Sequence, residues 1–339
     1  MVVDGSLFDF AFIPAGPLEQ AVDLIALGES LGYRGAWIPD QGFHRDPFVV
    51  LGQAAARTSR IQLGLGLTSP FTRLPVQIAR AAGTLDEVSD GRFKLGLGTM
   101  NVTHVLTPLG IPLERPVGRL RDAIKVIRSL LRGESVDFES EHDFLRQVSL
   151  DFEPPRSEIP IYIGTRGAQT LALAGELADG VLIESLFNAR GFDYVFENIE
   201  RGAAKSGRDL ATLDAVSWQV VQVTDDDQKA LAAQKPWVTR TVQVGPAHVM
   251  ERIGMDPEVV EAVTRHLDAD DREGAIASVT DETVRCVMII GGPEYVAERI
   301  GTVLKSKATA INLLLLGPTD ELRTTLTRFV REVLPLVDG

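Results

Sequence analysis

The chain has 339 residues, 45% of them hydrophobic, which is enough for one large domain or two ordinary ones. Its net charge of -13 argues against nucleic acid or an anionic membrane as a partner. The single cysteine, Cys286, excludes an internal disulfide and is typical of a cytoplasmic protein. The N-terminus lacks a signal-peptide pattern, and every apolar run is far shorter than the roughly 20 residues of a membrane span.

Short apolar runs alternate with amphipathic stretches along most of the chain. Eight runs are predicted to be strands: Leu7–Ile13, Gly35–Pro39, Ile61–Thr68, Phe93–Gly98, Pro160–Gly164, Gly180–Ile183, Asp214–Val223 and Ala308–Leu316. Helices are predicted at Leu18–Leu31, Pro47–Arg57, Pro75–Val88, Pro116–Leu131, Gln169–Leu177, Arg190–Ser206, Pro293–Lys305 and Asp320–Leu334. Eight successive strand–helix units favour an α/β fold with a closed (β/α)8 TIM-type barrel over a doubly wound sheet. We therefore expect residues 1–339 to form one barrel domain.

Two segments interrupt this alternation. Gly133–Pro155 is polar with short β-like pieces, Val136–Phe138 and Val148–Leu150, and predicts a surface hairpin or extended excursion. Residues 225–282, after the seventh strand, are mostly helical. We interpret this insertion as a lid over the barrel mouth, with a helical decoration that has no role as the alternative.

The C-terminal ends of the strands carry the reactive groups in a TIM barrel. Asp40 and Gln41 follow the second predicted strand, and Thr99 follows the fourth. A carboxylate at this place could orient a cofactor ring or serve as an acid or base. Asp40 could equally cap a helix or pair with Arg45.

The third predicted strand ends in Thr68 and Ser69, ahead of Pro70. Their hydroxyls could hydrogen-bond a bound ring, or they could form an ordinary turn.

The loop after the fifth strand is a candidate anion site. Free backbone N–H groups at a helix N-terminus, glycines for close approach and one arginine are the features that bind a phosphate. The alternative is a turn whose glycines only allow tight packing. The residues are Gly164, Thr165, Arg166, Gly167, Ala168 and Gln169.

Glu251 is the candidate that the insertion contributes, because it could point from the lid into the pocket as a catalytic group. A solvated helix face is the alternative interpretation. The five histidines show neither pairing nor carboxylate spacing typical of a metal site, so no metal is expected.

Several motifs resemble those of the luciferase-like flavin and deazaflavin oxidoreductases, over a similarity that runs from about Phe8 to Leu334. The motifs are Leu63–Pro75, Thr84–Phe93, Leu95–Gly98, Pro160–Gly167 and Leu173–Ile183. The last two resemble the branch that uses coenzyme F420, typified by methylenetetrahydromethanopterin reductase.

This resemblance implies a TIM-like barrel that binds the cofactor ring at its C-terminal mouth and transfers hydride between C5 of F420 and a small-molecule substrate. It also implies a cis peptide bond between Gly66 and Leu67 behind the ring, and a phosphate-bearing tail at the loop 164–169. Asp40 and Gln41 would orient the ring. Members of the family usually form homodimers.

The chain departs from the reductases at Ala11, where they carry glutamate, and at Gln41, where histidine is common. The loop Thr99–Asn101 lacks the acidic residue that sugar-phosphate dehydrogenases of this group use. The substrate is therefore left unassigned. One alternative is an FMN-dependent luciferase-like monooxygenase working with a partner reductase. Another is a non-catalytic barrel that only binds a cofactor.

Overall fold

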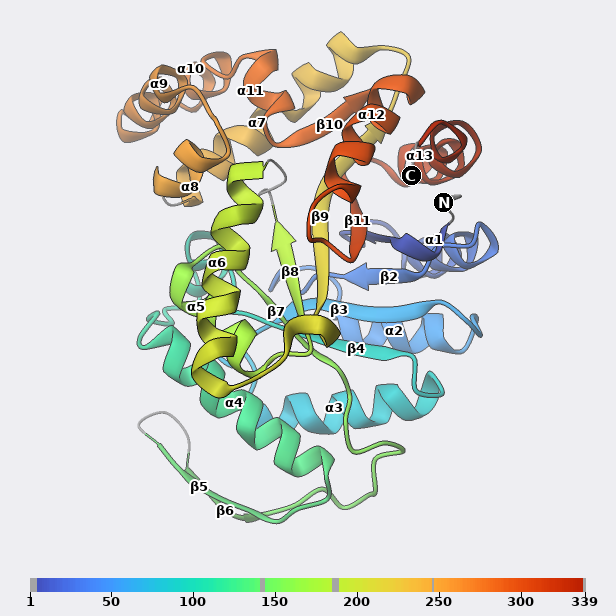
Figure 1. Ribbon diagram of the computed structural model, residues 1–339, viewed down its shortest axis with the longest axis vertical. Coiled ribbons are helices and arrows are strands. Elements are labelled where there is room, and N and C mark those ends of the chain that lie inside the picture. The colour runs from blue at the N-terminus through green and yellow to red at the C-terminus, as the bar shows by residue number, and fades with distance from the viewer. Residues whose placement is uncertain (1–4, 141–143, 185–188, 246, 338–339) are drawn as a thin grey trace.

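A ring of parallel strands forms the centre of the computed structural model (Figure 1), which describes residues 5–140, 144–184, 189–245 and 247–337. The strands of the ring are β1 (Phe8–Phe12), β2 (Gly35–Ile38), β3 (Gln62–Thr68), β4 (Phe93–Leu97), β7 (Ile161–Gly164), β8 (Gly180–Glu184), β9 (Asp214–Val223) and β11 (Ala310–Leu315). They pair in this order, and β11 pairs with β1 to close the ring. Within the described residues this confirms the predicted eight-stranded TIM-type barrel.

Helices follow the strands and cover the outside of the ring (Figure 1). They are α1 (Leu18–Ser30), α2 (Pro47–Ala55), α3 (Pro75–Val88), α4 (Pro116–Leu131), α5 (Ala168–Leu177), α6 (Ala189–Ser206), α12 (Pro293–Leu304) and α13 (Thr319–Arg328). Their apolar stripes pack on the outward faces of the strands: α1 lies against Phe10 of β1 at Gly28, where an added Cβ would clash with the Phe10 ring. A short π-helical turn, Val102–Leu106, follows β4.

The segment after β9 is helical, as predicted. It contains α7 (Asp227–Val244), α8 (Ala247–Arg252), α9 (Pro257–Asp268), α10 (Arg272–Ala277) and α11 (Asp281–Arg285). A strand that the sequence did not predict, β10 (Met288–Gly291), follows them and pairs in parallel with residues 220–223 of β9. This pairing is possible because β9 has ten residues and extends beyond the ends of its neighbours in the ring.

The predicted hairpin is present as β5 (Val136–Glu139) and β6 (Phe144–Val148), which pair antiparallel. The second strand of the hairpin, β6, lies earlier in the chain than the predicted strand Val148–Leu150. Val136, the first residue of β5, pairs with Val148, and because the strands are antiparallel, the later residues of β5 pair with residues that precede Val148.

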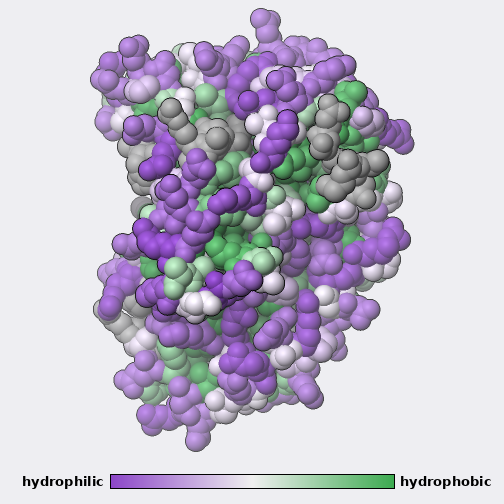
Figure 2. All heavy atoms as spheres, viewed as in Figure 1, coloured by the Kyte–Doolittle hydropathy of each residue, from purple (hydrophilic) through white to green (hydrophobic). Residues whose placement is uncertain are grey.

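No helix among the described residues is long and apolar enough to cross a bilayer. Figure 2 shows hydrophilic residues over most of one face, in agreement with the high charge, with apolar residues visible between them.

The N-terminal end of the barrel is closed by charged side chains. Asp9 of β1 is fully buried and accepts two hydrogen bonds from Arg34, at 2.8 and 2.6 Å, and one from Trp37 Nε1 at 2.9 Å. Arg34 also donates to Asp214 at 3.2 Å. Asp9 therefore faces the interior of the ring, and by the alternation of a strand so does Ala11.

Asp214 gives the stability of the barrel a predicted pH dependence. Burial alone would raise the pKa of this carboxyl, but the charges of Arg34 and Lys94 and hydrogen bonds from Thr309 and Tyr162 lower it to about 2. Because the folded pKa lies below the unfolded one, the stabilisation is present above about pH 4 and is lost as the pH falls towards 2.

The expected contribution at neutral pH is about 2 kcal/mol. Urea unfolding of the wild type and of Asp214→Asn, measured from about pH 5 down to about pH 2, checks it. The difference in free energy of unfolding between the two proteins should shrink as the pH falls. A constant difference would contradict the assignment.

Candidate active site

Asp40 lies at the C-terminal end of β2 and is held by donors from three places. Thr68 Oγ1 donates to Asp40 Oδ2 at 2.9 Å, and Arg73 Nε donates to the same oxygen at 3.3 Å. The backbone N–H of Gly42 donates to Oδ1 at 3.2 Å. Arg45, the alternative partner, donates instead to the carbonyl of Gly16 at 2.7 Å. The carboxylate is thus fixed in direction, with 9% of the side chain still exposed.

Arg73 joins Asp40 to a second carboxylate. Its Nη2 lies 2.7 Å from Asp46 Oδ2, and Asp46 caps α2 by accepting from the N–H of Phe48. Burial alone would lower the pKa of Arg73, but Asp46 and Asp40 raise it above its ordinary value. Arg73 therefore stays charged and holds the loop after β3 against the loop after β2. Arg73 was not among the predicted site residues, although it lies inside the motif Leu63–Pro75.

The end of β3 is irregular at the predicted place. The peptide bond between Gly66 and Leu67 is cis, as the resemblance implied, and the register between β3 and β4 shifts between Leu65 and Thr68. The side chain of Leu67 lies over the ends of β4 and β7. A Cβ added at Gly98 would be 2.7 Å from both of its methyl groups, and one added at Gly164 would be closer still. These two glycines make room for Leu67.

Trp218 of β9 reaches across the ring to β3. A Cβ added at Gly66 would lie 2.8 Å from the indole of Trp218, whose centroid is 6.2 Å from that of Trp37. Aromatic rings therefore occupy the interior below the mouth. No sequence signal distinguished Trp218 from an ordinary core residue of its strand.

Thr68 and Ser69 differ from the expectation that both touch a bound ring. Both are fully buried. The Thr68 hydroxyl is directed at Asp40, and Ser69 Oγ accepts from the N–H of Phe71 at 3.2 Å. In this arrangement the Thr68 hydroxyl supports Asp40. Ser69 stabilises the turn, which was the alternative interpretation for these two residues.

The other candidates are placed less closely. Gln41 and Thr99 are half-buried at the ends of β2 and β4. Glu251 lies on α8 and is exposed, in agreement with the alternative interpretation of a solvated helix face. Among the described residues, no group of three or more His, Cys, Asp and Glu side chains is placed to hold a metal ion.

The loop after β7 leads directly into α5, as predicted. Gly167 precedes the first residue of the helix, and no side chain caps the helix N-terminus. Thr165 Oγ1 accepts from the N–H of Gly167 at 3.0 Å. The guanidinium of Arg166 has no hydrogen bond or ion pair within the described part of the chain. Free N–H groups and an unpaired cation thus adjoin one another, while Gln169 is exposed.

Two more arginines, neither predicted, lie near this loop. Arg201 of α6 donates to the carbonyl of Ala168 at 3.3 Å. Arg252 of α8 lies over the ring of Tyr194, 4.7 Å from its centroid, and the Tyr194 hydroxyl donates to the carbonyl of Arg166 at 3.0 Å. The N-terminus of α5 is therefore surrounded by positive charge from three separate elements.

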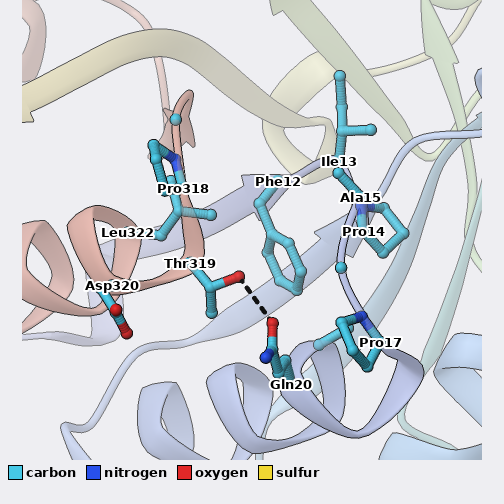
Figure 3. A pocket seen from close by; sticks show the side chains of 13 residues that line it. Phe12, Ile13, Pro14, Ala15, Pro17, Gln20, Pro318, Thr319, Asp320 and Leu322 are labelled. Atoms are coloured by element: carbon cyan, nitrogen blue, oxygen red, sulfur yellow. Dashed lines mark hydrogen bonds between the residues drawn. The ribbon is translucent and has the colours of Figure 1, made fainter.

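A separate pocket of about 430 Å³ lies between the loop after β1 and the loop after β11. Figure 3 shows Phe12 in it, with Gln20 of α1 and Thr319 of α13 joined by a 3.3 Å hydrogen bond. Phe12 alternates with the inward-facing Ala11, so this pocket lies outside the ring of strands. The pocket is therefore separate from the group around Asp40.

Comparison with known proteins agrees with this geometry. The pattern of the luciferase-like monooxygenase family matches residues 6–309. The chain is 34% identical over 308 residues to the 5,10-methylenetetrahydromethanopterin reductase of Archaeoglobus fulgidus, covering 90% of this chain and 92% of that one. It is 31% identical over 305 residues to the reductase of the same name from Methanolobus tindarius, with coverage of 90% and 92%.

Among solved structures, the coenzyme F420 dependent tetrahydromethanopterin reductase of Methanopyrus kandleri is similar over 99% of this chain and 100% of that one. The TM-score is 0.86 and the sequence identity 28%. The family pattern spans most of the chain, and the Archaeoglobus relative is more than 30% identical over nine tenths of it. The chain therefore belongs to the luciferase-like monooxygenase family.

Proposed function

We propose that this protein is a coenzyme F420-dependent oxidoreductase that transfers a hydride between C5 of the deazaflavin and a small organic substrate. The observation that carries the proposal is the group of Asp40, Thr68 and Arg73 beside Leu67 at the barrel mouth. The relatives named above support F420 as the cofactor, since one of them is described as F420 dependent.

The residues present fit this cofactor at both of its ends. Asp40 and Gln41 present polar atoms at the mouth for the edge of the ring, while Leu67 offers an apolar contact for its face. Arg166 and the uncapped start of α5 suit a phosphate. When bound, the deazaflavin supplies the hydride at C5. The side chains orient the two reactants and the helical insertion excludes water, which can lower the barrier by several kcal/mol.

Titration of the purified chain with F420 and with FMN tests the proposal. We expect saturable F420 binding in the micromolar range and much weaker FMN binding. Absence of F420 binding at micromolar concentrations would refute it. Binding of FMN alone would favour the FMN-dependent monooxygenase.

Replacing Arg166 with glutamine is expected to weaken F420 binding about tenfold, since one charge-assisted hydrogen bond to phosphate is lost. A deazaflavin riboside without the phosphate tail should bind both proteins equally. Fluorescence titration measures both affinities. Arg146→Gln, on the remote hairpin strand β6, is the matched control. An equal loss for both compounds in Arg166→Gln would show that the residue does not act on the tail.

We also propose that the protein works as a homodimer in the cytoplasm, where its single cysteine stays reduced. The supporting surface carries Phe43, Val49 and Leu74, which are 62%, 57% and 56% exposed. Phe43 and Val49 lie near Asp46 in the chain, and Leu74 follows Arg73. The ion pair between Arg73 and Asp46 therefore brings these exposed side chains onto one part of the surface. Light scattering of the wild type and of Phe43→Ser tests the proposed dimer: the wild type should be dimeric and the variant should dissociate more readily. A monomeric wild type would refute the proposal.

A further inference from the structure

A small cavity lies between the helical insertion and the loop after β4. Its volume is about 120 Å³. His104 of the π-helical turn Val102–Leu106 lines one side, and Arg240 and Gln243 of α7 and Arg272 at the start of α10 line the other. The cavity shares no residue with the loop 164–169 or with the group around Asp40.

Two arginines, Arg240 and Arg272, line the cavity. Within the described residues neither guanidinium has a hydrogen bond, or a carboxylate within 4.0 Å. By contrast, Arg285 in the same insertion lies 2.9 Å from Asp227. Asp270 also lines the cavity, but it too forms no ion pair there, so the two arginines outweigh it. A planar guanidinium is well suited to bind a carboxylate or a phosphate through two hydrogen bonds.

His104 adds a third polar group. Its Nε2 is buried and has no hydrogen-bond partner among the described residues. Burial and the charges of Arg240 and Arg272 lower the pKa of this imidazole, so the ring is neutral near pH 7. A buried ring nitrogen without a partner carries a desolvation cost that an incoming anion would remove by accepting its N–H.

We propose that this cavity binds an anionic group, a phosphate or a carboxylate, of the substrate. The inference rests on the proposed function and narrows its substrate to a small organic anion. The cofactor phosphate is already provided for by other side chains, namely those around the start of α5. Because the walls belong to the insertion and to the barrel loop, a bound anion would also hold the insertion against the barrel.

The test compares Arg240→Gln, Arg272→Gln and the double variant with wild type, using Arg265→Gln on α9 as the matched control. Isothermal titration of the full chain with inorganic phosphate and with succinate measures the anion site. Fluorescence titration with F420 and with the tail-free deazaflavin riboside measures the cofactor site. Circular dichroism shows whether each variant folds, and because Arg272 is exposed and Arg240 half-buried, we expect all of them to do so.

Wild type and Arg265→Gln should bind at least one of the two anions at millimolar concentration. Each single variant should weaken that binding about tenfold, and the double variant should abolish it, with F420 affinity unchanged throughout. No anion binding by wild type, or unaltered binding by the double variant, would overturn the proposal. Weaker binding of F420 but not of the riboside would assign the cavity to the cofactor tail and would equally overturn it.

The two proposals fail separately. A wild type that does not bind F420 refutes the proposed function, and with it the assignment of the anion to an F420-dependent substrate. The phosphate and succinate titrations would still show whether the cavity itself binds anions.

Discussion

Replacing Asp40 with asparagine is expected to weaken F420 binding about 30-fold, which corresponds to about 2 kcal/mol. The change keeps the shape of the side chain but removes the charge that Thr68 and Arg73 hold in place. A charged acceptor fixed by three donors loses little freedom on binding, so most of its interaction with the ring contributes to affinity. Fluorescence titration measures the effect.

Asp46→Asn is the matched control, because Asp46 is the other carboxylate on Arg73 and is exposed. It should leave the affinity within about twofold. Thr68→Val gives a second check, since Thr68 is buried and acts through Asp40. The double variant Asp40→Asn with Thr68→Val should therefore bind no more weakly than Asp40→Asn alone. Additive losses, or an Asp40→Asn variant with unchanged affinity, would show that Asp40 does not position the cofactor through this contact.

Replacing Asp9 with asparagine is expected to lower the free energy of unfolding by about 3 kcal/mol. Asp9 is fully buried and accepts from Arg34 twice and from Trp37 once. Without its charge, Arg34 keeps only Asp214 as a partner inside the closed end of the barrel. Leaving a charge poorly compensated in a buried place costs much more than losing an exposed pair.

Urea unfolding measures this effect as a lower midpoint with an unchanged slope. Asp23→Asn, which removes the exposed ion pair with Arg57, is the control and should cost less than about 0.5 kcal/mol. A cost below about 1 kcal/mol for Asp9→Asn would mean that the charges of this cluster add little net stability.

The helical insertion shows where prediction from local pattern succeeds and where it ends. Its helical character was predicted, because amphipathic periodicity is a local property. The strand β10, Met288–Gly291, was not predicted, because a short apolar run beside helical segments does not by itself distinguish a strand from part of a buried helix. Only its pairing with the far end of β9 identifies it as a strand.

The same limit applies to the candidate site. The position of a residue at the end of a strand selected Asp40, Thr68 and the loop 164–169, because parallel strands bring their C-terminal ends to one face. Position alone could not show that Thr68 is buried, or that Arg73 rather than Arg45 holds Asp40. It also could not show that Glu251 is exposed. The burial and the partners of these side chains depend on contacts between loops that are distant in the sequence, and no local pattern predicts such contacts.

The sequence by itself determined the barrel, the helical insertion and the family, because the periodicity of strands and helices and the short motifs are local features of consecutive residues. Only the tertiary structure decided which side chains meet. Arg34 reaches Asp9 and, 180 positions along the chain, Asp214. Arg240 and Arg272 face His104 across a cavity. Such contacts follow from the closure of the ring and the packing of the insertion on it, and many sequences with the same local pattern would place different side chains there.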